Sequence, residues 1–240
     1  MSLALADLRQ QLAAVIAGTP STAPGLATGI AALDGVLPGH GIPRGRITEL
    51  LAPAWLGKTT LARSLAAATL TAGHTVAWID ATRTLDPRDW VAVDAGRADT
   101  LWVVRPSAPA RAPWCADLLL RTGSFALVVL DGAPVLPRAV AVRLAQLARD
   151  GDAALLLLGE GTRASEIGGA LRIVMGKNKR GAAGVTATIE KGGSHQHVPL
   201  QLDLEIGRGN SVGIARRVHS HPQVPDRRGV AQGRRRRARR

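Results

Sequence analysis

A Gly-Lys-Thr triplet at residues 57–59 lies between an apolar, strand-like segment, RITELL, and a helical pattern that begins at Lys58. In loops with the spacing G-x-x-x-x-G-K-[ST], backbone amides and the helix N-terminus surround phosphates, the lysine reaches the outer phosphates, and the hydroxyl ligates magnesium. Gly57, Lys58 and Thr59 suit these three roles. The triplet therefore predicts a site for a nucleotide such as ATP, together with magnesium.

The residues before the triplet depart from that pattern. Ala52 stands where the first glycine belongs, and Trp55 with Leu56 brings bulk into a loop whose residues are usually small, so that backbone can approach a ligand. We expect Trp55 to crowd the loop. Two interpretations stay open: a site that still binds nucleotide and magnesium, and a strand-to-helix turn that is retained for packing after nucleotide binding is lost.

A second candidate residue ends another apolar segment. Asp131 closes FALVVLD, the position from which a carboxylate holds the water shell of magnesium in nucleotide-hydrolysing folds. A strand-terminal aspartate is weak evidence by itself. Together with the Gly-Lys-Thr triplet at the end of an earlier strand, Asp131 indicates a P-loop ancestry.

The elements that would position these residues alternate along the chain. Uninterrupted apolar segments predict buried strands at 46–51, 75–80, 100–104, 125–131 and 153–159. Helical patterns start at Lys58, near Pro87, before Leu118 and at Arg138. We therefore expect an α/β fold with a mostly parallel central sheet and helices on both faces. Three further apolar segments, at 170–175, 184–190 and 198–206, predict an antiparallel C-terminal extension of the sheet.

Composition suggests three parts. With 240 residues of which 46% are hydrophobic, the chain can bury one sizeable core, which we place at residues 26–208. Residues 1–25 predict an N-terminal helix and linker, because apolar residues recur at helical spacing: Leu5, Leu8, Leu12, Val15 and Ile16. That helix could fold back on its own domain or dock on another subunit. Residues 209–240 have too little apolar content to order themselves, and we expect a disordered tail.

The positive charge is concentrated in that tail. The net charge is +13, and residues 216–240 hold ten arginines against one acid, Asp226. We expect this tail to bind DNA phosphates through its eight last arginines, although a merely solvated tail remains an alternative. These are Arg227, Arg228, Arg234, Arg235, Arg236, Arg237, Arg239 and Arg240.

Membrane and secreted classes are not favoured. The longest apolar runs, such as 153–158, fall far short of the roughly 20 residues of a membrane span. Asp7 among the first residues suits neither a signal nor a transit peptide, so we expect a cytoplasmic protein without membrane contact. The single cysteine, Cys115, cannot form an internal disulfide, and we expect it to be buried.

Five segments in order, ATGIAALDGVL, GIPRGRITELLAP, GKTTL, HTVAWIDATRTLDP and FALVVLD, resemble the core of the RecA recombinase family. The resemblance covers residues 27–131, with weaker similarity to about residue 206. It implies a RecA-like P-loop fold. It also implies nucleotide contacts from Gly57, Lys58, Thr59 and Thr60, and a magnesium-linked carboxylate at Asp131, with Thr59 as the second magnesium ligand.

Two departures from that family concern catalysis. Thr82 stands where the family carries the glutamate that activates the attacking water. A general base contributes about 10²–10⁴-fold in rate, so its loss predicts a protein that does not hydrolyse ATP and has no catalytic residue. Glu160 stands at the family's DNA-sensing glutamine, and an ionised carboxylate cannot donate a proton to a phosphate. The alternative is that Glu160 replaces the missing base.

The segments through which RecA grips DNA are also short here, which predicts that strand exchange is absent. A short RecA-like chain with these losses resembles the ImuA group, accessory proteins of DNA-damage-induced (SOS) mutagenesis by translesion synthesis. The resemblance implies three partners: RecA, a Y-family-like polymerase subunit of the ImuB type, and a replicative-type error-prone polymerase. Two other hypotheses remain open: an active DNA-dependent ATPase of the RecA and RadA class, and a cell-division inhibitor resembling SulA.

Overall fold

The structure is a computed structural model that describes residues 24–90, 100–132, 134–161, 169–177, 184–193 and 196–200. The chain divides into two units, residues 1–207 and 208–240, and every described residue lies in the first. The expected N-terminal helix over residues 3–17 and the arginine-rich tail lie outside the described residues, so both stay predictions.

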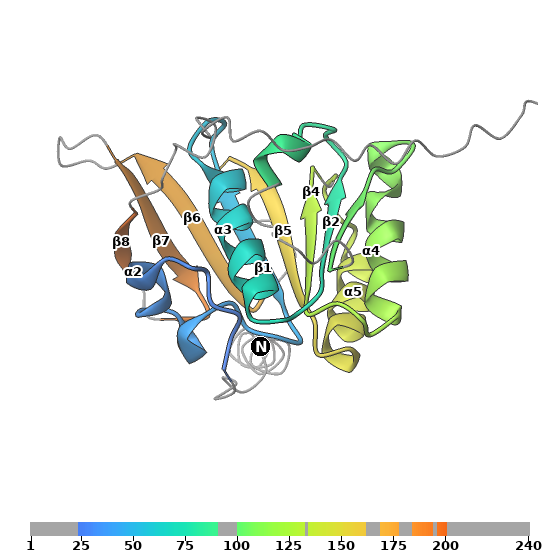
Figure 1. Cartoon of the computed structure of the whole chain (residues 1–240), viewed down its shortest axis with the longest axis horizontal. Coiled ribbons are helices and arrows are strands. Elements are labelled where there is room, and N and C mark those ends of the chain that lie inside the picture. Colours follow the sequence, from blue (N-terminus) through green and yellow to red (C-terminus); the bar gives the residue numbers. More distant parts are fainter. Residues whose placement is uncertain are drawn as a thin grey trace, which may run out of the picture. The chain divides into compact units, whose positions relative to one another are not determined.

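A single sheet organises the described residues (Figure 1), in the order β3-β2-β4-β5-β1-β6-β7-β8. Every pairing from β3 to β6 is parallel, and the pairings of β6 with β7 and of β7 with β8 are antiparallel. The predicted fold class is confirmed, including the antiparallel extension. The strands are β1 (Ile47–Ala52), β2 (Val76–Asp80), β3 (Leu101–Val104), β4 (Leu127–Asp131), β5 (Ala154–Glu160), β6 (Leu171–Lys177), β7 (Val185–Lys191) and β8 (His197–Leu200).

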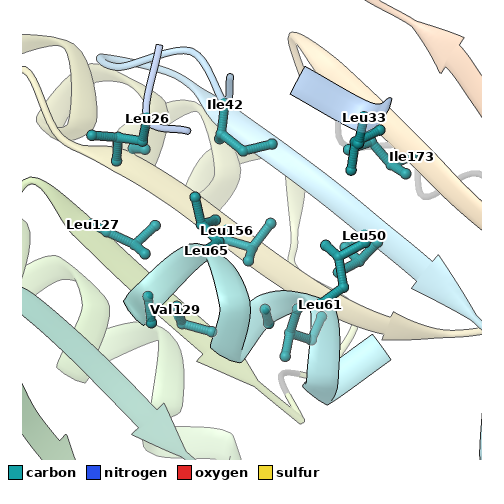
Figure 2. Close-up of a cluster of buried hydrophobic side chains, with 14 of the residues drawn as sticks. Leu26, Leu33, Ile42, Leu50, Leu61, Leu65, Leu127, Val129, Leu156 and Ile173 are labelled. Carbon is teal, nitrogen blue, oxygen red and sulfur yellow. The ribbon is translucent and has the colours of Figure 1, made fainter. Parts of the chain in front are cut away.

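Helices cover both faces of this sheet because alternate side chains of a buried strand point to opposite sides. In β4, Leu127 and Val129 belong to the core that includes Leu61 and Leu65 of α3 (Lys58–Thr71), as Figure 2 shows. The alternate residues of β4, Val128 and Leu130, pack instead with α4 (Ala112–Arg121) and α5 (Arg138–Asp150). The sheet is thus sandwiched, with α3 on one face and α4 and α5 on the other.

Short helical segments complete the described part. These are α2 (Ala31–Asp34), η1 (Pro38–His40), η2 (Pro87–Trp90) and η3 (Pro109–Arg111). The helix expected near Pro87 is a single 3-10 turn, η2, whose Trp90 packs edge to face on Trp78 with ring centroids 5.0 Å apart. Cys115 is buried in α4, as expected. None of the helices that the structure describes has the length and apolarity needed to cross a membrane.

Candidate nucleotide site

The register of the parallel strands brings four strand ends to one edge of the sheet. Asp80 at the end of β2 pairs with Asp131 at the end of β4. Ala52 at the end of β1 pairs with Glu160 at the end of β5. Three acidic residues therefore gather at the edge from which the loop 53–57 leaves β1, as expected for the carboxyl ends of parallel strands.

The loop ends in a left-handed residue at the start of α3. Gly57 has φ 78°, a conformation that costs a residue with a Cβ about 1–2 kcal/mol and costs glycine little. Gly57 has no side chain to cap the first amides of the 14-residue helix α3. Thr59 is exposed and Thr60 partly exposed in that first turn. The loop and helix start therefore fit a phosphate, whose oxygens would accept from these amides.

Lys58 points from the helix start toward β5. Its ammonium Nζ donates a hydrogen bond to the backbone carbonyl of Gly159, at 3.0 Å. A side chain at Gly159 would come within 2.6 Å of Leu51 Cδ2, so glycine allows the close approach of β1 and β5 at this point. The lysine is thus held beside the strand that leads to Glu160.

The two unusual residues of the loop behave differently from what their sizes suggest. Trp55 adopts φ 69° and its side chain is 100% exposed, so the expected crowding of the loop by Trp55 is not found. The indole therefore lies in solvent. Ala52 is completely buried as the last residue of β1, where its methyl group joins the core under α3.

Asp131 is buried at the centre of the acidic edge, and burial is the main reason that its pKa rises to about 6. The nearby charges of Asp80 and Glu160 raise this pKa further, and the charge of Lys58 lowers it. Desolvation and like charges both disfavour the ionised carboxylate. At pH 7 Asp131 is still mostly ionised, as a magnesium ligand must be.

Thr82 is bound into its own loop. Its hydroxyl Oγ1 donates to Asp80 Oδ1 at 3.2 Å and lies 2.8 Å from the hydroxyl of Thr84. Its methyl Cγ2 packs so closely on Gly132, which has φ 76°, that a side chain at residue 132 would collide with it. Thr82 therefore faces the residue that follows Asp131 but brings no titratable group to it.

Asp80 holds this loop together, and its cationic partner was not predicted. Its side chain is completely buried and accepts from the Thr84 amide at 3.1 Å and the Leu85 amide at 3.3 Å. Arg105, which follows β3, donates from Nε to Asp80 Oδ2 at 2.9 Å and from Nη2 to the Leu85 carbonyl at 2.6 Å. The sequence did contain a signal for this partner: an aspartate in a buried apolar strand needs a cation or hydrogen-bond donors close to it.

The structure thus brings most of the predicted site residues to one edge of the sheet: Gly57, Lys58, Thr59, Thr60, Thr82, Asp131 and Glu160. The predicted arginines of residues 227–240 lie outside the described residues. A Gly-Lys-Thr triplet at the start of a helix, with an aspartate at the end of a nearby parallel strand, defines a site of the phosphate-loop class.

Comparison with known proteins narrows this class. The family of the RecA N-terminal domain matches residues 14–159, more than half of the chain, and the chain belongs to this family. Its similarity to proteins named RecA covers a shorter segment. The RecA proteins of Mycobacterium bovis and Nocardia farcinica are each 41% identical to it over 113 residues, which is 47% of this chain. That of Rubrobacter xylanophilus is 40% identical over 117 residues, 48% of this chain.

The matched segment is a small part of those relatives. It spans 14% of the Mycobacterium bovis protein, 32% of the Nocardia farcinica protein and 33% of the Rubrobacter xylanophilus protein. The chain therefore spans about a third or less of the length of these curated relatives. The activities of the full-length relatives are therefore only proposals for this chain.

Proposed function

We propose that this protein is a RecA-like accessory protein of DNA-damage-induced mutagenesis, of the ImuA type, that serves translesion synthesis without hydrolysing ATP. It would act by binding RecA, an ImuB-type polymerase subunit or a replicative-type error-prone polymerase. The observation that carries the proposal is Thr82, whose hydroxyl is occupied by Asp80 and Thr84 at the position where a working site needs a base.

A group that takes a proton from the attacking water, or orients it, accelerates hydrolysis by about 10²–10⁴-fold. A threonine hydroxyl cannot do this at neutral pH, and Asp80 is already engaged by Arg105 and two backbone amides. Asp131 occupies the position of the magnesium-linked carboxylate. Among the described acids at this edge, Glu160, exposed at the end of β5, is therefore the one left for such a role.

Nucleotide binding is compatible with the same residues. Gly57, Lys58, Thr59 and Thr60 would hold the phosphates of ATP, and Thr59 with Asp131 would hold magnesium. The bound magnesium ion would supply positive charge that offsets the charge of the phosphates. In this proposal the nucleotide stabilises the carboxyl edge of the sheet and the loop 53–57 instead of being consumed.

The domain organisation belongs to the same proposal. Residues 1–25 would form a helix and linker that dock on a partner, residues 26–208 the RecA-like core, and residues 209–240 a disordered basic tail that binds DNA. The described strands and helices, all between Ala31 and Leu200, support the extent of the core.

ATP turnover tests the absence of hydrolysis. Phosphate release by the full chain, with and without single-stranded DNA, should equal that of a Lys58→Ala variant. Thr82→Glu should not create activity either, because the new carboxylate would lie beside Asp80 and near Asp131 and Glu160 and would lose the hydrogen bonds of Thr82. Thr82→Gln is the control of equal size. DNA-stimulated, Lys58-dependent turnover would contradict the proposal.

RecA strand exchange tests the accessory role. A subunit that keeps the RecA-like core but has short DNA-gripping segments could join the end of a RecA filament and block its extension. We expect added protein to inhibit strand exchange in proportion to its amount, and a variant lacking residues 1–17 to inhibit less. Unchanged strand exchange over a wide range of stoichiometries would count against binding to RecA.

A second candidate function is an active DNA-dependent ATPase of the RecA and RadA class. Two observations favour it: the identity to proteins named RecA, and the position of Glu160, close enough to raise the pKa of Asp131. In that case Glu160→Gln should abolish turnover while nucleotide binding persists. The first candidate predicts no turnover for Glu160→Gln to remove.

A further inference from the structure

Glu160 is a carboxylate at the candidate nucleotide site that a protein without hydrolysis does not need as a base. It is the last residue of β5 and is exposed. Two residues earlier in alternating order, Leu158 and Leu156, belong to the core that includes Leu61 of α3, and Figure 2 shows Leu156 in this core. Because every second side chain of a strand points to the same face, Glu160 continues this row on the face that α3 covers.

The helix α3 begins beside this end of β5. Lys58, the first residue of α3, donates from Nζ to the carbonyl of Gly159 at 3.0 Å, and Gly159 directly precedes Glu160. Ala52, from which the loop 53–57 leaves β1, is the register partner of Glu160. The start of the loop and the start of the helix therefore both lie next to Glu160.

The carboxylates at this edge act on one another. Burial raises the pKa of Asp131 most, and the charges of Asp80 and Glu160 raise it further. Arg105 is paired with Asp80, and the charge of Lys58 opposes the others at Asp131. The negative charge of Glu160 is therefore felt inside the site, although its side chain is exposed.

A bound nucleotide would add more negative charge to the same edge. In phosphate loops the backbone amides surround the inner phosphates, and the lysine reaches the outer ones. Here Lys58 lies beside the peptide that leads into Glu160, so an outer phosphate held by Lys58 would come close to that carboxylate. Like charges that are close together and partly desolvated disfavour binding. A nucleotide with one phosphate fewer places less charge there.

We propose that Glu160 makes this site selective for a nucleoside diphosphate such as ADP over the corresponding triphosphate. This deepens the proposed function, on which it rests, by naming the nucleotide that a site without hydrolysis retains. The loop 53–57, Lys58 and the first turn of α3 hold the two nearer phosphates, and the carboxylate of Glu160 repels the third. Glu160 is thus a specificity-determining residue.

Calorimetric titration of the full chain with ADP, and separately with the β,γ-imido analogue of ATP, tests the selectivity in the presence of magnesium. We expect ADP to bind at least about tenfold more tightly, and this difference to shrink as salt is added. Glu160→Gln removes the charge at constant size. It should strengthen binding of the ATP analogue at least about tenfold and change the affinity for ADP less than about threefold. Glu160→Asp keeps the charge and should keep the preference.

Glu190→Gln is the matched control. Glu190 is also an exposed glutamate near the end of a strand, β7. Because β7 runs antiparallel to β6, this end of β7 lies at the opposite edge of the sheet. Its substitution changes the net charge by the same amount and should leave both affinities unchanged. Circular dichroism checks that all variants fold, and the preference of the wild type is measured without any variant.

The other outcomes overturn this inference and separate it from the proposed function. Equal affinities in the wild type, no binding of either nucleotide, or a preference that Glu160→Gln leaves unchanged would show that Glu160 does not select the nucleotide. Weaker binding of the ATP analogue by Glu160→Gln would assign Glu160 to magnesium instead. In all these cases the accessory role without hydrolysis stands. Phosphate release from ATP that Glu160→Gln abolishes would make Glu160 a base and overturn the proposed function as well.

Discussion

At the residue scale, two neighbouring aspartates of this site meet opposite surroundings. Asp80 and Asp131 pair across β2 and β4, and both are buried. Asp80 receives a guanidinium, a hydroxyl and two backbone amides, which stabilise its charge. Burial and two like charges raise the pKa of Asp131, against the opposing charge of Lys58. Thus Asp80 serves the structure of the loop, and Asp131 is left available to a ligand.

The raised pKa of Asp131 predicts a pH dependence of stability. In the folded state the Asp131 carboxyl has a pKa of about 6, against an ordinary value of 3.8. The contribution of the protonated carboxyl to the free energy of unfolding is therefore complete below pH 3.8 and is lost as pH rises through 6. Asp131→Asn keeps a neutral group at every pH. In metal-free buffer, its free energy of unfolding should match wild type near pH 4 and exceed it by about 2–3 kcal/mol at pH 7.

Urea unfolding of both proteins at pH 4, 5, 6 and 7 in the presence of a chelator measures this difference. The two proteins differ only at residue 131, so the difference between the two curves reports on the Asp131 carboxyl. Two parallel curves would show that the carboxyl at residue 131 is solvated like an ordinary surface aspartate.

At the element scale, β1 is tied to the extension of the sheet by a buried ion pair. Glu49 and Arg172 are register partners in β1 and β6, with side chains 2% and 12% exposed. Arg172 donates to Glu49 Oε2 from Nε at 2.8 Å and approaches it with Nη2 at 2.7 Å. A charged pair between two mostly apolar strands favours one register, because a shift by one residue would separate the two buried charges.

Breaking this pair should therefore be costly. Arg172→Met leaves the Glu49 carboxylate buried without its guanidinium, and we expect a loss of about 3–5 kcal/mol in the free energy of unfolding. Glu49→Leu combined with Arg172→Met should recover most of that loss, since no charge then remains to be desolvated. Denaturant titration at pH 7 measures both. A double variant no more stable than Arg172→Met would show that the lost packing, and not the loss of the guanidinium beside the carboxylate, sets the cost.

At the scale of the whole molecule, the concentration of charge in residues 216–240 predicts salt-sensitive DNA binding. Deleting residues 214–240 should abolish binding while the core stays folded, because the tail carries little apolar surface. For the full chain, log affinity should fall with log salt by about 0.9 per phosphate neutralised. No aromatic residue lies between Val212 and Arg240, so duplex and single strands should bind alike.

Fluorescence anisotropy with labelled duplex and single-stranded DNA, over a range of salt, measures these quantities. A chain whose residues 227–240 are scrambled at constant composition is the matched control and should bind as wild type does, since only charge density matters. If the truncated protein binds DNA as tightly as the full chain at moderate salt, the DNA site lies on the core.

Local patterns in the sequence determined the strands, the main helices and the grouping of Lys58, Asp131 and Glu160. Uninterrupted apolar segments specify buried parallel strands, and residues that end such strands meet at one edge whatever the details of packing. The resemblance to RecA rested on the same short segments, and the family match confirms it.

Tertiary structure alone decided what these residues touch. Arg105 binds Asp80, which lies 25 residues earlier in the chain, and Thr82 packs on Gly132. Trp55 is exposed to solvent, where the sequence led us to expect crowding of the loop. The exposure of Trp102, Trp114 and Leu118 likewise depends on which faces of β3 and α4 the rest of the fold leaves uncovered. The spacing of apolar residues indicates which face of a single helix or strand is buried. Contacts depend instead on which elements lie side by side and on backbone conformations such as the left-handed one at Trp55.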